Sequence, residues 1–193
     1  MKFEVYRSTV LPHVIIIHYF RVKFTTMKSF TMILALLCST SIIAQEQAAA
    51  VIKQALETAV KQDKKVLVMF HASWCGWCKK MDTNMNNELV KEFFDDSFVT
   101  TYLTVQETPK NKKLENPGGK AIMNSYGGAN SGLPFWVILD ANGSLLTNAN
   151  DEHGENLGCP NTTAEVAAFI AKLKEHTTID VKTVQDVVTV FSK

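Results

Sequence analysis

Two cysteines three residues apart, Cys75 and Cys78, are the residues of this sequence best suited to chemistry. They follow a short apolar run with β-branched residues, preceded by lysines, which is typical of a buried strand. The pair should open a helix, where free backbone N–H groups and the helix dipole favour an anion such as a thiolate. We therefore expect the pKa of Cys75 to fall from about 8.5 toward neutrality. Because Cys78 lies within one helical turn, the pair could form a disulfide that opens and closes with little backbone movement.

Two other interpretations of the pair stay open at this point. It could be a permanent structural disulfide, although so small a loop restrains the unfolded chain little. It could also be half of a zinc site, which His153 and Cys159 would complete. Cys159 itself is predicted to be a free, partly buried thiol, with a regulatory or intermolecular disulfide as the alternative.

The elements that must position the pair follow from hydrophobic spacing and from clusters of Gly, Pro and Asn. We expect helices at 46–61, from 76 to an interruption at 84–87, and at 88–94, 120–126, 164–174 and 181–191. We expect strands at 66–71, 98–105, 134–140 and 144–147. Polar stretches at 107–120 and 148–158 are predicted surface loops, and Thr162 to Glu165 is a predicted capping box.

Composition describes an ordinary globular protein. The 193 residues are 46% apolar and 20% charged, which allows one domain with a substantial core and some appendages. A formal net charge of +1 gives no indication of nucleic acid or of an acidic partner. No Gly-rich phosphate loop follows a strand, so nothing indicates a nucleotide.

The N-terminal part of the chain predicts export. Residues 27–44 contain a lysine, an apolar stretch and a small residue before a polar one, as in a secretory signal peptide cleaved after Ala44. An uncleaved membrane anchor is the alternative, although the apolar run is shorter than about 20 residues. Residues 1–26 are interpreted as an upstream extension, with Met27 as the true start, or as a long n-region. Residues 45–193 then form the mature domain.

Two motifs in this order carry a resemblance to a known family. Trp74-Cys-Gly-Trp-Cys78 follows the first strand, and Leu133-Pro134 opens the third. The sequence resembles the thioredoxin superfamily, and more narrowly the exported bacterial thioredoxin-like proteins, over roughly residues 48–174. The resemblance implies an α/β thioredoxin-like fold, in which helices flank a central mixed sheet of about four strands, here with an extra C-terminal helix.

The resemblance also implies the roles of the site residues. Cys75 is the attacking thiol, and Cys78 is the resolving thiol of a thiol–disulfide exchange. Pro134 has a cis peptide bond beside the pair, and the backbone of Leu133 pairs with a substrate peptide. Because such a proline would crowd out a metal ion, we predict no metal, and no cofactor is expected.

The residues next to the pair have supporting roles in this interpretation. Trp74 is expected to flank the substrate groove, and Trp77 to be exposed as an apolar contact. Gly76 and Trp77 stand where thioredoxin has Gly-Pro, and these positions tune the reduction potential. Met69 stands where thioredoxin has a buried aspartate that assists proton transfer. His71, on the same strand face, is the candidate substitute as proton acceptor, although such a histidine more often only packs.

The function that follows is an exported, periplasmic oxidoreductase that exchanges disulfides with protein cysteines. Its expected partners are protein substrates with cysteines or disulfides, and a separate membrane protein that supplies electrons. The alternative is a binding or chaperone module, built on the same fold, in which the cysteine pair is not catalytic.

Overall fold

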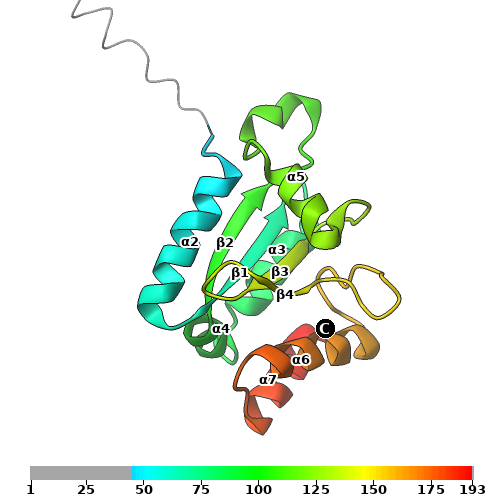
Figure 1. Cartoon of the computed structure of the whole chain (residues 1–193). Helices are drawn as coiled ribbons and strands as arrows, with labels where there is room; N and C mark the ends of the chain where they lie inside the picture. Colours follow the sequence, from blue (N-terminus) through cyan, green and yellow to red (C-terminus); the bar gives the residue numbers. More distant parts are fainter. Residues whose placement is uncertain (1–44, 193) are drawn as a thin grey trace, which may run out of the picture. The chain divides into compact units, whose positions relative to one another are not determined.

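The computed structural model describes residues 45–192, so the predicted signal peptide at 27–44 and the segment 1–26 lie outside the described residues. The described chain contains helices on both sides of each parallel strand and two helices at its C-terminal end (Figure 1). In order they are α2 (Ala48–Gln62), β1 (Lys65–His71), α3 (Gly76–Met85), α4 (Lys91–Ser97), β2 (Phe98–Thr104), the 3-10 helix η1 (Pro109–Leu114), α5 (Gly119–Met123), the π-helical turn η2 (Asn124–Gly128), β3 (Phe135–Leu139), β4 (Leu145–Asn148), α6 (Thr163–His176) and α7 (Val181–Phe191).

The strands form one mixed sheet of four strands in the order β2-β1-β3-β4, which confirms the predicted architecture. β1 is parallel to β2, with His71 opposite Thr104 at the end of the pairing. β3 runs antiparallel to β1, with Phe70 opposite Phe135. The carboxyl end of β1 and the start of β3 therefore meet at one edge of the sheet. The cysteine pair follows β1 at this edge, and Pro134 immediately precedes β3 there.

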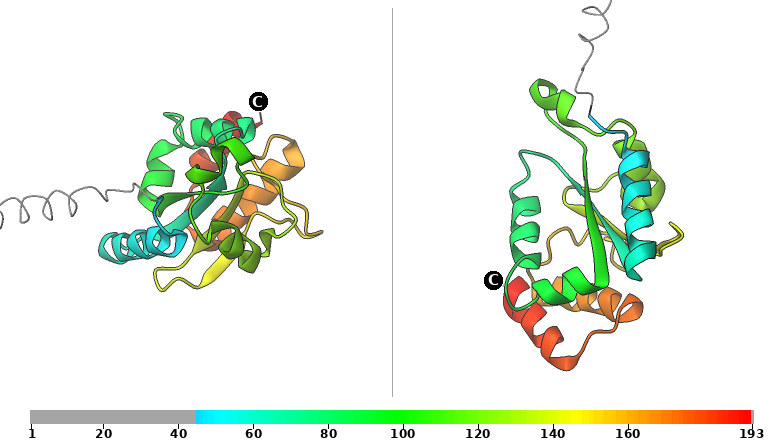
Figure 2. Two further views of the ribbon diagram at one scale, coloured as in Figure 1. Left: turned by 90° about the horizontal axis from the view of Figure 1, so that it is seen from above. Right: turned by 90° about the vertical axis from the view of Figure 1, so that its left-hand side faces the viewer.

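Helices cover both faces of the sheet. α2 and α5 lie on one face, whereas α3, α6 and α7 lie on the other (Figure 2). This double cover explains the composition of the two inner strands: all five residues of β3 are buried, and so are the five interior residues of β1. A strand that is buried on both faces reads as a continuous apolar run, as the sequence indicated.

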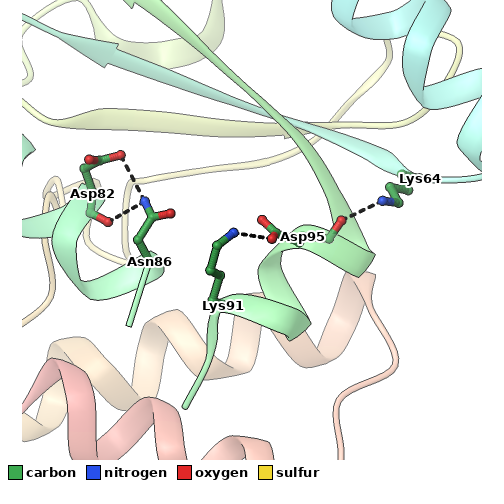
Figure 3. Close-up of polar contacts among 5 residues, drawn as sticks. All are labelled: Lys64, Asp82, Asn86, Lys91 and Asp95. Atoms are coloured by element: carbon green, nitrogen blue, oxygen red, sulfur yellow. Dashed lines mark hydrogen bonds and ion pairs between the residues drawn. The ribbon is translucent and has the colours of Figure 1, made fainter. Parts of the chain in front are cut away.

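Asparagine ends α3 at the predicted interruption. α3 stops at Met85, and the side-chain amide of Asn86 donates to the backbone oxygen of Asp82 at 2.9 Å (Figure 3). The backbone N–H of Asn86 donates to the same oxygen at 3.0 Å, so the side chain shares the last helical carbonyl with the backbone rather than taking it away. The predicted helix at 88–94 is wrong at its start, because residues 88–90 form a turn and α4 begins at Lys91.

The start of β1 and the end of α4 are joined by polar contacts. Lys91 forms an ion pair with Asp95 one turn along α4. The side chain of Lys64, just before β1, donates to the backbone oxygen of Asp95 at 2.7 Å (Figure 3). The second bond satisfies a carbonyl near the end of α4, where helix carbonyls lack partners within the helix.

The two C-terminal helices close the core on the face of α3. Thr162 and Glu165 form the predicted capping box at the start of α6. α7 has the predicted bounds and buries Val187, Val190 and Phe191. The ring of Phe169 on α6 lies 5.3 Å from that of Phe191, so aromatic packing holds α7 against the domain.

The structure differs in detail from two predictions, the surface loop at 107–120 and the helix at 120–126. The predicted surface loop at 107–120 contains η1, and α5 already begins at Gly119. The predicted helix at 120–126 is split into α5 and η2, and the chain leaves it at Gly127, whose φ of 90° suits glycine. Among the residues described, no helix is both long enough and apolar enough to cross a membrane.

Candidate active site

The cysteine pair lies where β1 passes into α3. Cys75 and Cys78 form a disulfide with an S–S distance of 1.93 Å and a Cα–Cα distance of 5.3 Å. Cys75 is the N-cap residue of α3, and its sulfur accepts the backbone N–H of Cys78 at 3.1 Å. The attacking sulfur of the resemblance thus occupies the helix position that favours an anion. Both residues are buried.

Leu133, the residue before Pro134, lies against the pair. The Leu133–Pro134 peptide bond is cis, as the resemblance implied. Leu133 packs on a small apolar cluster that consists of Ala72, Cys75 and Cys78 and is separate from the main core. The antiparallel pairing of β1 with β3 brings these residues together across a long stretch of sequence.

The two tryptophans of the motif are half exposed, as expected for contact residues. Trp74 is 54% exposed and Trp77 is 51% exposed. The indole N–H of Trp74 donates to the backbone oxygen of Gln106 at 2.9 Å, so its orientation is fixed from the loop after β2. The ammonium of Lys80 lies 5.8 Å from the ring centre of Trp77, within range of a cation–π contact. A Cβ added at Gly76 would meet no atom within 4 Å, so space at that position does not require glycine.

His71 and Cys78 line the same cavity. This cavity has a volume of about 520 Å³, and Asp82 and Tyr102 also line it. The Nε2 atom of His71 is 3.2 Å from the hydroxyl of Thr104. Burial lowers the pKa of His71 below its usual 6.5, although the nearby carboxylates act in the opposite direction. His71 is therefore neutral at pH 7, in a state that can accept a proton.

Tyr102 and Asp82 both line this cavity and are joined by a hydrogen bond. The hydroxyl of Tyr102 donates to the carboxylate of Asp82 at 2.6 Å. Burial first, and then this bond, raise the pKa of Tyr102 well above its usual value, so the hydroxyl stays protonated. Met69, where thioredoxin has an aspartate, is buried in the main core.

Sequence reasoning missed a buried carboxylate next to the motif. Glu107 begins the stretch predicted as a surface loop, yet it is only 7% exposed. Its two carboxylate oxygens accept the backbone N–H of Ser73 at 2.5 Å and the hydroxyl of Ser73 at 2.8 Å. One signal could have found it: Glu107 follows a strand parallel to β1, and the carboxyl ends of adjacent parallel strands meet at one edge.

Asn156 was also missed. It lies in the predicted polar loop at 148–158, and its amide donates to the backbone oxygens of Gly132 at 3.0 Å and of Pro134 at 3.1 Å. Its side-chain oxygen accepts the backbone N–H of Gly158 at 3.0 Å. The loop therefore holds the segment around Pro134, and no pattern in the sequence indicated this contact.

Cys159 is a free and buried thiol, as predicted. Burial raises its pKa to about 11. Its sulfur lies 4.0 Å from the side-chain amide of Asn84 on α3. Within residues 45–192, no three His, Cys, Asp or Glu side chains are grouped as metal ligands, and His153 has an exposed side chain.

Comparison with known proteins identifies part of this chain. Residues 47–141 match a family model described as thioredoxin-like. No curated protein matches the sequence.

Solved structures are similar at low identity. A disulphide isomerase from Xylella fastidiosa Temecula1 is 17% identical, with a TM-score of 0.45 over 74% of this chain and 90% of that one. The oxidised C-terminal domain of DsbD from Neisseria meningitidis is 28% identical, with a TM-score of 0.38 over 54% of this chain and 84% of that one. A DsbH oxidoreductase is 25% identical, with a TM-score of 0.40 over 75% and 94% of the two chains.

Proposed function

From the premise that residues 47–141 are a thioredoxin-like domain with a Cys-x-x-Cys pair, we propose that this chain is a thiol–disulfide oxidoreductase acting on protein cysteines. One observation carries the proposal. The Cys75–Cys78 disulfide caps a helix and forms a cluster of its own with Leu133, which precedes the cis proline. A disulfide that only braced the fold would restrain little, because the loop that it closes is very short.

The reaction follows from two sulfurs of unequal roles. In the reduced protein, the Cys75 thiolate attacks one sulfur of a substrate disulfide, and the other substrate sulfur leaves and takes up a proton. Cys78 then loses its proton and attacks the sulfur of Cys75. This step restores the Cys75–Cys78 disulfide and releases the second substrate thiol, so two electrons pass from the pair to the substrate. Oxidation of a dithiol substrate is the same path in reverse.

The neighbouring residues have positioning roles in this proposal. Leu133 pairs its backbone with an extended substrate segment, and Pro134 shapes that segment's seat beside the disulfide. Trp74 and Trp77 flank the groove and supply apolar contact, and their half-exposed rings support this role. Gly76 and Trp77 tune the reduction potential as residues between the cysteines.

His71 is the proposed proton acceptor for Cys78. It shares a cavity with this cysteine and is neutral at pH 7, and both facts support the role. Removal of the proton makes Cys78 a nucleophile for the second step of the exchange. The position of the buried aspartate of thioredoxin is filled by Met69, so this chain needs another group for that task.

We place the reaction outside the cytoplasm, in a bacterial periplasm. The signal-peptide pattern at 27–44 supports this location, and residues 45–193 are then the mature domain. The expected partners are proteins with cysteines or disulfides and a separate membrane protein that exchanges electrons with the pair. Sequencing the N-terminus of the exported protein tests the pattern, since a mature chain that begins at Gln45 is expected.

A trapping experiment tests the reaction. In a Cys159→Ser background, Cys78→Ser should leave Cys75 bound to substrates as mixed disulfides, because the resolving thiol is absent. The matched control is Cys75→Ser, which should trap nothing. The protein without either of these two changes should reduce insulin in the presence of dithiothreitol. Failure of both the trap and the insulin assay would overturn the proposal.

A binding or chaperone module is the second candidate, and the half-exposed Trp74 and Trp77 favour it. In such a module the cysteine pair does not cycle. Alkylation of the reduced protein at neutral pH separates the two candidates. A reaction at Cys75 no faster than at an ordinary thiol favours the binding module, since an oxidoreductase needs an activated thiolate.

A further inference from the structure

The carboxylate of Glu107 holds the segment that leads into the attacking cysteine. Both of its oxygens accept hydrogen bonds from Ser73, at 2.5 Å from the backbone N–H and at 2.8 Å from the hydroxyl. Ser73 stands two residues before Cys75. Glu107 itself is 7% exposed, which is rare for a carboxylate unless it is paired.

Two parallel strands bring this carboxylate to the segment that precedes Cys75. The backbone N–H of Val105 donates to the oxygen of His71 at 2.8 Å, so the pairing of β1 with β2 continues to the last residue of β1. Gln106 then adopts a φ of 54°, and its backbone oxygen accepts the indole N–H of Trp74. Two consecutive residues after β2 thus hold two consecutive residues before Cys75.

We propose that the negative charge of Glu107, held at Ser73, makes the Cys75–Cys78 pair more reducing. This inference rests on the proposed function only in assuming that the pair can be reduced. Burial raises the pKa of Glu107, but the hydrogen bonds from Ser73 and from the backbone of Thr108 outweigh it, so the carboxylate is ionised at neutral pH.

The sign of the effect follows from the charges in each redox state. Reduction of the disulfide by two glutathione molecules gives one oxidised glutathione, a Cys78 thiol and a Cys75 thiol. The Cys75 thiol releases its proton to become the thiolate. The negative charge of Glu107, which is hydrogen-bonded to Ser73 two residues before Cys75, destabilises this thiolate but has little effect on the neutral disulfide. The carboxylate therefore raises the pKa of the Cys75 thiol and favours the oxidised pair, which makes the pair a stronger reductant.

The other charged groups around Glu107 do not cancel the effect of its negative charge. His71 on β1 interacts with it and is neutral at pH 7 because burial lowers its pKa. Glu115 accepts the backbone N–H of Glu107 at 2.8 Å, and it is itself paired with Lys112 at 2.9 Å. Asp82 on α3 lines the cavity that contains Ser73 and Cys78, and it accepts a hydrogen bond from the hydroxyl of Tyr102.

The experiment is a glutathione titration of the pair in otherwise unchanged protein, with Cys159→Ser throughout. Glu107→Gln keeps an oxygen for Ser73 but removes the charge. It should raise the equilibrium constant for reduction by about three- to tenfold, which corresponds to roughly 15 to 30 mV. The thiolate absorbance of Cys75 should titrate at lower pH. Glu107→Asp and Ser73→Ala disturb the contact but keep the charge, and should stay within about twofold of the starting protein.

A second pair of variants keeps the proposal testable if Glu107→Gln does not fold. Asn111 lies on η1, and its amide is 3.3 Å from the hydroxyl of Ser73. Asn111→Lys brings a cation near the carboxylate and should raise the same constant, whereas Asn111→Ala should not. Equal shifts in the charged and neutral variants, or no shift in Glu107→Gln, would overturn the proposal. The titration needs no protein substrate, so it stays informative even if the trap with Cys78→Ser fails.

Discussion

Replacing Asn156 with alanine should destabilise the domain by about 2 kcal/mol, because one side chain makes three hydrogen bonds there. Its amide donates to the oxygens of Gly132 and Pro134, and its oxygen accepts the N–H of Gly158. Each such bond contributes roughly 0.5 to 1.5 kcal/mol net, and the partly exposed positions of these three place them in the lower half of that range. For a domain of this size, the loss should lower the melting temperature by roughly 4 to 8 °C.

Urea unfolding of the oxidised protein at neutral pH measures this loss directly. Asn156→Asp should be no better than Asn156→Ala, because a carboxylate cannot donate and would face two carbonyl oxygens. The matched control is Asn142→Ala, which changes an exposed asparagine and should stay within about 0.5 kcal/mol. A loss at Asn156 no larger than that of the control would refute the reasoning, since it would mean that the loop does not hold the segment around Pro134.

The remaining predictions concern His71 and Cys159. Because the pKa of His71 is lowered by burial, the protein should lose stability as pH falls from about 6.5 through the folded pKa. His71→Gln should remove that loss in urea unfolding near pH 7.5 and pH 5, and His153→Gln, at an exposed position, should not. His71→Gln should also slow the release of substrate from Cys75 by about tenfold or more in stopped-flow assays, with little change in the first attack. Cys159, with its pKa raised to about 11 by burial, should resist iodoacetamide in the folded reduced protein and react after denaturation, as followed by mass spectrometry.

Local sequence signals predicted the framework of the fold well. The apolar run of β1, the capping box of Thr162 and Glu165, and the interruption at Asn84–Asn87 each depend on residues a few positions apart, and the structure confirms them. The number of strands was also predicted, and the bounds of α7 agree with the expected helix.

Contacts between distant loops could not be predicted from such signals. Glu107 and Ser73 are 34 positions apart, and Asn156 and Gly132 are 24 apart. Both Glu107 and Asn156 lie in polar stretches, and a polar residue looks the same in sequence whether water or a distant backbone group is its partner. Only the pairing of the strands decides which loops meet. The contacts of Glu107 and Asn156 could therefore be identified only once the arrangement of the sheet was known. The pairing of the two cysteines was predictable because they stand only three positions apart, within one helical turn.

The order of the strands separates what is fixed in the site from what can adjust. The disulfide follows β1 and Pro134 precedes β3; these are the two inner strands, and their interiors are fully buried. Amide groups of such strands are usually the last to exchange with solvent, while outer strands open more readily. Glu107 follows β2, and the loop of Asn156 follows β4, and these are the two outer strands. The disulfide and Pro134 therefore adjoin the strands expected to open last, whereas Glu107 and Asn156 follow the strands expected to open first.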